Sequence, residues 1–342
     1  MKTYQDGEIY FIRESEYGTG KPSPFVKIGL VHYRENRDSF GRLSEHQTGN
    51  PRKLLLDTKQ VVKTQAVDMV EAQLHRRFSE QRISGEWFEF NDDKSLEVAV
   101  NEAQKLANEV IGLMPLFKEA MELDQIVSNT DSRPATSEEI AIATRVVIAR
   151  KQLVKCKAVA QVRDDLITKA YNEGSDVSMV AKPSVRNYSP KFLEDEFKVE
   201  NEKLWNKYQG FEETWQHTFT LDRKIKPDSL GEDFEAKILY VESILESVSK
   251  GGDFADLVEV TLALKNLEGI AQWEDKVFTA RLKLAIGKLD KLEGACTWKR
   301  YWDKKTKFDS SRFAEENPVL AKKYVSTPEP TKSLRAKKGK TQ

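Results

Sequence analysis

The stretches GEIYFIRE (residues 7–14) and FVKIGLV (residues 25–31) decide the fold of the N-terminal part of the chain. Both are short and rich in β-branched and aromatic residues, which favours β-strands. The intervening EYGTGKPSP (residues 16–24) has the glycine and proline content of a turn or loop. We therefore expect a mainly antiparallel sheet to begin here.

The residues that follow add further strands and two helices to this sheet. Residues 39–51 end in Gly-Asn-Pro, which fits a short helix, and residues 53–65 fit one strand or two halves of one. Residues 66–82 carry apolar side chains at the spacing of one helical face, and EWFEF (residues 86–90) fits a final strand. The order β-β-α-β-α-β predicts a small α/β domain over residues 1–94.

From about residue 95 the pattern changes, and residues 95–326 are predicted to be mainly α-helical. The predicted helices cover residues 95–123 with a break or kink at Pro115, 137–171, 190–209, 233–250, 254–270 and 276–292. Linkers near residues 126–136 and 174–188 could subdivide this region, and no clear internal repeat is visible. Residues 327–342 are expected to form a disordered basic tail. The whole chain is thus predicted to be an α+β protein.

Two local signals mark the starts of helices in this region. Thr136, followed three residues later by Glu139, is a capping box. Ser189 and Pro190 fit the N-cap and the first position of the helix that is expected to reach Gln209.

Composition restricts the class of protein. The chain has 55 basic and 55 acidic residues, so its net charge of zero does not by itself favour a nucleic-acid binder. It has no apolar run long enough to span a membrane and no apolar core of a signal peptide at its start. Cys156 and Cys296 are far apart and form no metal-binding pattern. We expect a cytoplasmic protein with two free thiols and no membrane contact.

The N-terminal residues resemble the GIY-YIG nuclease superfamily. The matching elements, in chain order, are EIY at residues 8–10, KIG at residues 27–29, Arg42, His46 and Glu71. The KIG form of the second tripeptide and GEWFEF at residues 85–90 resemble the phage-type branch, which includes T5orf172/MUG113-like domains. The resemblance covers residues 5–92. It implies an endonuclease that uses Mg²⁺ or Mn²⁺ to hydrolyse phosphodiester bonds, with DNA as the expected substrate and RNA as the alternative.

The chemistry of phosphodiester hydrolysis suggests roles for these residues. Glu71 is placed to bind the metal ion, because one carboxylate with waters and a substrate phosphate commonly holds Mg²⁺. It lies beside the apolar face of its helix, between Val70 and Leu74, where an unpaired carboxylate is costly. Arg42 can contact two phosphate oxygens, and it shares a helix face with His46.

Two side chains are candidates for activating the attacking water. In the family, the tyrosine at the position of Tyr10 is held to orient or deprotonate the water, but a free tyrosine pKa of about 10 matches neutral pH poorly. Lys27, expected on the strand face opposite Val26 and Ile28, could lower that pKa. His46 could serve as the base instead, because its unperturbed pKa is closer to neutral.

The sequence departs from the family pattern at three points. Glu8 replaces a glycine, and we expect its side chain to point away from the site. Lys27 replaces a tyrosine, which leaves the water-activating group open. Asn91 is too loosely spaced to take the role of a late asparagine found in many members.

Other residues have competing interpretations. His75, four residues after Glu71, could orient that carboxylate or pack in the core. Arg76 and Arg77 could contact nucleic acid or form a solvated face. Trp87 is expected in the core rather than stacked on a base.

TWKRYWDKKTKF (residues 297–308) interleaves aromatic residues with cations, among them Lys299, Arg300, Lys304 and Lys305. Such a segment could stack bases and contact phosphates. The favoured interpretation is instead an amphipathic helix that packs its aromatic side chains into a helical bundle while the lysines face water.

Three hypotheses about function remain open. The first is an endonuclease of phage, mobile-element or anti-phage defence type, with a helical region for targeting or oligomerisation. The second is an inactive nucleic-acid-binding protein on a nuclease fold. The third is an interaction or structural protein, in which the helical region binds a protein partner or a second copy of the chain.

Overall fold

The N-terminal domain is an antiparallel sheet with helices on both faces. The computed structural model describes residues 5–33 and 37–336. The first elements are β1 (Gly7–Ser15), β2 (Pro22–His32), α1 (Ser39–Gln47), β3 (Leu54–Leu55), a 3-10 turn (Thr58–Gln60), β4 (Val61–Thr64), α2 (Val67–Arg77), β5 (Arg82–Ser84) and β6 (Trp87–Glu89). The sheet order is β3-β1-β2-β6-β5, β4 also pairs with β1, and these pairings are antiparallel. The predicted antiparallel sheet is confirmed, with the third strand split in two and β5 as an addition.

The sheet separates two sets of apolar side chains. One face, which includes Phe11 and Ile28, packs with α2 and the first part of α3 in one buried core. The other face carries Tyr10 and Ile12 and packs with Leu43 of α1. Alternation along β1 therefore presents Tyr10 to α1.

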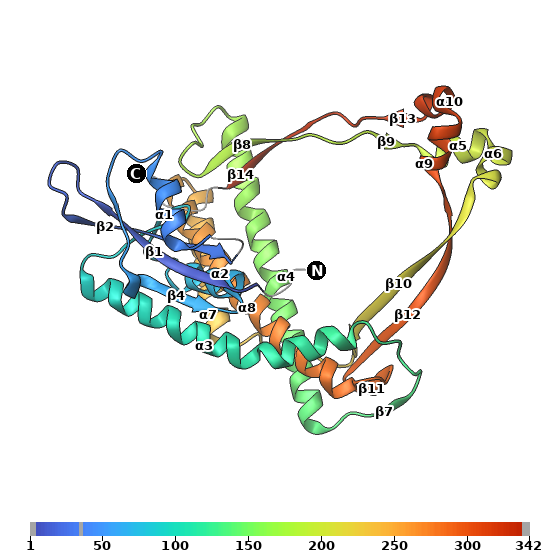
Figure 1. Cartoon of the computed structure of the whole chain (residues 1–342), viewed down its shortest axis with the longest axis horizontal. Helices are drawn as coiled ribbons and strands as arrows, with labels where there is room; N and C mark the ends of the chain where they lie inside the picture. The colour runs from blue at the N-terminus through green and yellow to red at the C-terminus, as the bar shows by residue number, and fades with distance from the viewer. Residues whose placement is uncertain (1–4, 34–36, 337–342) are drawn as a thin grey trace.

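Four long helices form the body of the molecule (Figure 1). They are α3 (Asp93–Leu123), α4 (Ser137–Asn172), α7 (Glu232–Ser249) and α8 (Leu257–Ile286), the last preceded by a 3-10 turn (Phe254–Asp256). Helices α4, α7 and α8 enclose a second apolar core. The capping box of Thr136 and Glu139 is present at the start of α4, as predicted. Within the described part of the chain, every helix is too short or too polar to cross a membrane.

Two of these helices are longer than predicted. The expected break at Pro115 does not occur, because Pro115 lies on the exposed side of α3, where water can satisfy the carbonyl that proline leaves free. The helices expected over residues 254–270 and 276–292 are joined in one helix, α8, because residues 271–275 contain no glycine or proline to end it. Residues 287–292 are not helical, because the helix ends at Ile286 before Gly287, whose φ is positive.

The remaining elements build ribbons and a small helical lobe. They are β7 (Ser132–Pro134), β8 (Ala181–Arg186), β9 (Lys191–Phe192), α5 (Glu194–Glu200), α6 (Glu202–Lys207), β10 (Gln209–Leu221), β11 (Lys291–Glu293), β12 (Cys296–Phe308), α9 (Ser310–Glu316), α10 (Pro318–Lys323), β13 (Val325–Ser326) and β14 (Thr331–Ala336). Figure 1 shows α5, α6, α9 and α10 as a lobe held away from the body by two arms. One arm is the β10–β12 ribbon, and the other contains the β8–β14 and β9–β13 pairs.

Three predictions for this part of the chain are wrong. The helix expected over residues 190–209 begins only at Glu194 and is divided into α5 and α6. Residues 297–308 form a strand rather than a helix, because they pair along their length with β10. Residues 331–336 of the expected disordered tail pair with β8, whereas residues 337–342 lie outside the described residues.

The lobe is built from an internal repeat that the sequence prediction missed. The pattern KFxxxxFxxENxxLxxKY occurs at residues 191–208 and again at residues 307–324. Each copy forms a short pair of helices followed by a strand. Both copies lie within the predicted helical region of residues 95–326, but they are separated by α7 and α8, which conceals them from a search for adjacent repeats.

The two copies exchange the same contacts reciprocally. The hydroxyl of Tyr208 donates to Glu316 (2.6 Å) and accepts from Asn317 (2.8 Å). The hydroxyl of Tyr324 donates to Glu200 (2.5 Å) and accepts from Asn201 (2.8 Å). Equivalent aromatic rings also meet, with centroids 4.5 Å apart for Phe197 and Phe313. This is the contact pattern of a twofold-symmetric pair, here within one chain.

We expect Tyr208→Phe and Tyr324→Phe to loosen the whole lobe to a similar extent. Each change removes the hydroxyl that pairs with the other copy, at a cost of about 1–3 kcal/mol. Hydrogen–deuterium exchange should increase in both repeats, 191–208 and 307–324, in either variant. Tyr240→Phe, which removes an exposed tyrosine–glutamate hydrogen bond in α7, is the control. Faster exchange in only one repeat would contradict the reciprocal arrangement.

Candidate active site

The register between β1 and β2 places Tyr10 at the centre of the site. Tyr10 lies directly opposite Gly29 and is only 1% exposed. A Cβ atom at residue 29 would lie 2.5 Å from the Tyr10 hydroxyl oxygen. The glycine of the KIG tripeptide is therefore required because the tyrosine ring occupies the space of its side chain.

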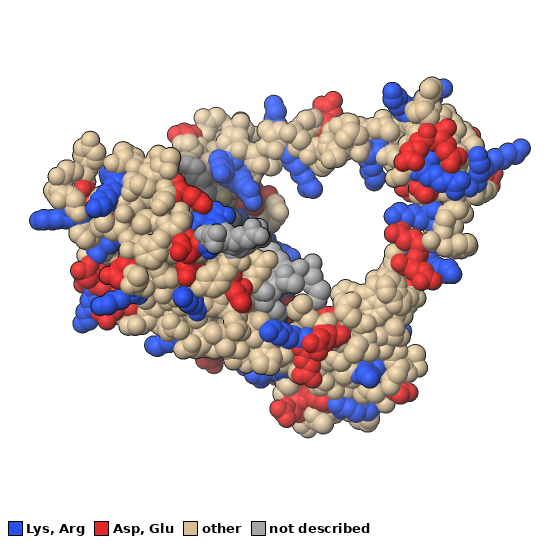
Figure 2. Space-filling model, in the orientation of Figure 1, with Lys and Arg blue, Asp and Glu red and all other residues tan. Residues whose placement is uncertain are grey.

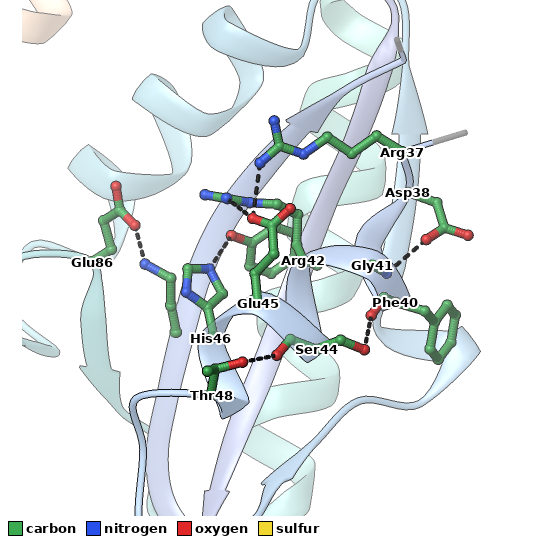
Figure 3. Close-up of polar contacts among 12 residues, drawn as sticks. Arg37, Asp38, Phe40, Gly41, Arg42, Ser44, Glu45, His46, Thr48 and Glu86 are labelled. Carbon is green, nitrogen blue, oxygen red and sulfur yellow. Dashed lines mark hydrogen bonds and ion pairs between the residues drawn. The ribbon is translucent and has the colours of Figure 1, made fainter. Parts of the chain in front are cut away.

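A buried carboxylate anchors α1 over the same face of the sheet. Glu8 accepts hydrogen bonds from the main-chain nitrogen (3.0 Å) and the hydroxyl (2.7 Å) of Ser39, the first residue of α1. An acid is favourable at a helix N-terminus. Glu8 thus faces the same side as Tyr10, and the expectation that it points away from the site is wrong. Asp38 adds an N-cap by accepting from the main chain of Gly41 at 2.8 Å (Figure 3).

Tyr10 of β1 and His46 of α1 form a hydrogen-bonded pair, and Figure 3 labels His46 with its contact drawn as a dashed line. The Tyr10 hydroxyl oxygen and His46 Nε2 are 3.1 Å apart. Burial raises the pKa of Tyr10 and outweighs the opposing effect of Arg42. Burial, together with the cations Lys27 and Arg42, lowers the pKa of His46. At neutral pH the pair therefore consists of a protonated phenol and a neutral imidazole that can accept a proton.

Two ion pairs flank the tyrosine–histidine pair. Arg42 pairs with Glu45, one turn along α1, and Lys27 pairs with Glu86, just before β6 (Figure 3). Glu86 was missed by sequence reasoning, although it lies within the GEWFEF segment. The signal that could have found it is the antiparallel pairing of β2 with β6, which brings that segment beside the KIG tripeptide.

Lys27 lies on the predicted face of β2. It is directly opposite Ile12 of β1 and Trp87 of β6, whereas Val26 and Ile28 point into the core on the other face. Its side chain is only 12% exposed. Trp87 packs with the apolar cluster around Tyr10, as expected for a core residue rather than a base-stacking one.

Glu71 projects from α2 without a partner of its own. Burial raises its pKa to about 7, the negative charges of Glu86 and Asp68 add to the increase, and Lys27 and Arg82 act against it. Among the residues that the structure describes, none donates a hydrogen bond to this carboxylate or forms an ion pair with it. A bound divalent cation would supply the missing positive charge, so the site fits the hard metal ion that the resemblance implies.

The metal site would rest on Glu71 rather than on a protein cage. No cluster of three or more histidine, cysteine, aspartate or glutamate side chains suited to a metal occurs in residues 5–33 or 37–336. Mg²⁺ commonly binds through one or two carboxylates, completed by water and substrate phosphate. Glu86 is the acidic neighbour with the largest effect on Glu71, but its carboxylate is already paired with Lys27.

His75 supports the strand rather than Glu71. Its Nε2 lies 2.8 Å from the main-chain oxygen of Ile28, and its ring packs on Phe88 with centroids 5.2 Å apart. Burial lowers its pKa to about 4, so it is neutral at physiological pH. Of the two roles considered for His75, the structure therefore favours packing.

Arg76 and Arg77 are engaged within the protein, which argues against the predicted nucleic-acid contacts. Arg76 donates to the main-chain oxygen of Gly269 in α8 at 3.2 Å and occupies the space beside that glycine. Arg77 forms an ion pair with Glu102 of α3. Both arginines join the N-terminal domain to the helices that follow it.

The aromatic and basic segment over residues 297–308 divides between the two faces of β12. Arg300 is fully buried and donates to the main-chain oxygens of Leu123 (2.8 Å) and Gly287 (2.7 Å), so the prediction that it contacts nucleic acid is wrong. Trp298 is also fully buried, beneath the Arg300 guanidinium.

The lysines of this strand are exposed, and two of those predicted to bind nucleic acid have acidic partners. Lys304 pairs with Glu213 at 3.7 Å, and Lys305 pairs with Asp303 at 3.2 Å. Lys299 is exposed on the same strand. The positive charge that the sequence suggested for this segment is therefore largely balanced by acids on the same ribbon.

Together, fold and site define an antiparallel sheet domain. It contains a tyrosine–histidine pair, two cations and an unpaired carboxylate, whose charges affect the pKa values of Tyr10, His46 and Glu71. Residues 7–110 match the family model of the T5orf172 domain, a domain found in phage-type, GIY-YIG-like nuclease-associated proteins. The match extends past the predicted boundary at residue 94 into α3, which completes the core of this domain. No curated protein and no solved structure matches the chain.

We expect Gly29→Ala to displace Tyr10 from His46. The new methyl group would overlap the tyrosine ring, and overpacking of this kind costs about 1–3 kcal/mol. Urea unfolding should show the loss, and the variant should have low activity in any assay that depends on Tyr10. Gly49→Ala is the control, because a Cβ atom there meets nothing within 4 Å. Equal stability of the two variants would contradict the tight packing at Gly29.

Proposed function

We propose that the protein is a divalent-metal-dependent endonuclease that hydrolyses phosphodiester bonds in DNA. The observation that carries this proposal is the cluster of Tyr10, Lys27, Arg42 and His46, together with the unpaired carboxylate of Glu71, which acts electrostatically on Tyr10 and is acted on by Lys27. These groups come from β1, β2, α1 and α2 and are brought together only by the fold. The T5orf172 match over residues 7–110 supports a nuclease-type domain.

We assign the activation of the attacking water to His46, with Tyr10 as its hydrogen-bonded partner. The lowered pKa of His46 keeps its imidazole neutral and able to take a proton near pH 7. The raised pKa of Tyr10 keeps its phenol protonated, so Tyr10 is suited to orient the imidazole or the water. This choice between the two candidates rests on their burial and on the cations beside the histidine.

The cations and Glu71 would act on the phosphate. Arg42 is half-buried, and its guanidinium can leave the exposed Glu45 to contact two phosphate oxygens. Lys27 can place a second positive charge near the scissile group. Glu71 would hold Mg²⁺ or Mn²⁺, which when bound stabilises negative charge on the phosphate and on the leaving oxygen.

Other features of the proposal concern substrate and setting. RNA is the alternative substrate, since these groups recognise a phosphodiester rather than a particular sugar. The T5orf172 match favours a phage-associated nuclease domain. A mobile-element or anti-phage defence role and a cytoplasmic location are part of the proposal. The helical region would serve targeting, a protein partner or pairing with a second copy.

A binding protein without activity is the second candidate, and the presence of the whole residue set weighs against it.

We expect Glu71→Gln to lose about 100-fold or more of the activity, because a metal ion contributes several kcal/mol to such reactions. The substitution keeps the shape of the side chain and removes its charge. Conversion of supercoiled plasmid to nicked or linear DNA, with Mg²⁺ or Mn²⁺, measures this loss. Glu89→Gln, an exposed change on β6, is the control and should cut normally.

Two results would contradict the proposal in different ways. If Glu71→Gln cuts as fast as the wild type, the assigned site is wrong. If the wild type cuts neither DNA nor RNA with either metal, the non-catalytic alternative is supported.

The raised pKa of Glu71 predicts a pH-dependent stability in the metal-free protein. A carboxylate whose pKa rises from 4.5 to about 7 on folding favours the folded state only while it is protonated. The contribution of Glu71 to the free energy of unfolding should therefore fall as pH rises from 4.5 to 7, by up to about 3 kcal/mol, and it is read as the difference between the wild type and Glu71→Gln. Glu71→Gln should be more stable than the wild type at pH 8 and nearly equal to it at pH 4.5. Chemical unfolding in EDTA tests this, and an equal difference at both pH values would contradict it.

A further inference from the structure

The two arms that hold the lobe differ in charge. In each arm, the strand before one copy of the internal repeat pairs with the strand after the other copy. The repeat therefore relates the two arms to each other. In the β10–β12 arm, acids balance the lysines: Lys307 pairs with Glu212 at 2.9 Å and Lys304 with Glu213 at 3.7 Å. In the β8–β14 pair, residues 181–186 and 331–336 contain four cations and no acid. In Figure 2, lysine and arginine side chains project from the arm that contains β8 and β14. Some of them point into the opening that the two arms and the lobe enclose with the body.

The β8–β14 pair has one face that is apolar except for Lys332 and one face that is wholly polar. Ala181, Leu334 and Ala336 lie on the first face and pack against the core of α4, α7 and α8. The register places the following residues on the opposite face: Lys182, Ser184 and Arg186 from β8, and Thr331, Ser333 and Arg335 from β14. This polar face consists only of cations and hydroxyl groups.

The cations of this face lack acidic partners. Lys182 lies directly opposite Arg335, an arrangement of like charges that weakens a strand pair. In the described part of the chain, no carboxylate forms an ion pair with Lys182, Arg186 or Arg335, nor with Lys332, which lies on the other face of the pair. Arg186 instead lies over the ring of Tyr188, with its guanidinium carbon 5.3 Å from the centroid. An external anion would relieve the repulsion.

We propose that the polar face of the β8–β14 pair binds the sugar–phosphate backbone of the DNA duplex that the N-terminal domain cuts. Lysine, arginine, serine and threonine side chains are common donors to phosphate oxygens, and side chains that alternate along a ribbon present them in a row. A row of phosphates is the anion that matches such a row of donors. The identity of the ligand rests on the proposed nuclease function. The sequence suggested nucleic-acid recognition by β12, whereas this proposal assigns it to the arm that contains β8 and β14.

The test compares the two arms in the full-length protein. Binding of a short fluorescent DNA duplex is measured by anisotropy at several NaCl concentrations, with EDTA present so that no cutting occurs. The double variant Lys182→Gln with Arg335→Gln should bind about tenfold more weakly or worse, and the slope of log affinity against log salt should fall by about 2. The control, Lys304→Gln with Lys307→Gln, removes the same charge from the other arm and should bind within about twofold of the wild type.

Thermal unfolding of the free protein is the second measurement. Removing the Lys182–Arg335 repulsion should leave the stability unchanged or raise it, so weaker binding cannot be attributed to unfolding. Equal losses in both double variants, no loss in the first, or no duplex binding by the wild type would overturn the proposal. Because binding is measured without metal, it is independent of catalysis: a protein that binds through this arm but cuts nothing would refute only the nuclease function. Plasmid cleavage with unchanged binding in the first variant would refute only the role of the arm.

Discussion

The pairing of Tyr10 with Gly29 is the contact on which the candidate site depends. β1 and β2 could slide by two residues and keep the same faces buried, but another residue would then lie over Tyr10. Only a residue without a Cβ atom admits the ring, so the glycine selects the register. That register also places Lys27 opposite Ile12 and Glu8 within reach of Ser39. The position of α1, and hence of Arg42 and His46, follows from the same pairing.

The N-terminal site could be predicted from sequence because its signals are local. Each signal occupies only a few residues: short strands, a helix ended by Gly-Asn-Pro, and a helix with the carboxylate of Glu71 beside its apolar face. The order of these signals carries the resemblance. Glu86 escaped because its role depends on a partner far away in the chain. The direction of the Tyr10 pKa also escaped, because Lys27 was considered as the neighbouring cation. In the structure burial dominates, and Arg42 is the cation that opposes it.

The second half of the chain was harder to predict because its signals are long-range. Residues 297–308 have the composition of an amphipathic helix, yet they pair along their whole length with β10, whose sequence lies about 90 residues earlier. Pairing of distant strands overrides local propensity. The repeat at residues 191–208 and 307–324 escaped for a similar reason: each copy builds half of a core that closes only when the two meet. Arg300 illustrates the consequence, since a residue that looks like a surface cation is buried among main-chain oxygens.

The N-terminal domain is joined to the body by a shared core rather than by a linker. α3 contributes Leu96 to the core under the sheet and Phe117 to a cluster with α8, so one continuous helix belongs to both parts. Arg76 adds a contact from α2 to the main chain of Gly269. A helix that shares its apolar face between two cores cannot bend without exposing one of them, which costs about 25 cal/mol for each Å² of apolar surface. Bending between the N-terminal domain and α8 is therefore opposed by the packing of α3 in both cores.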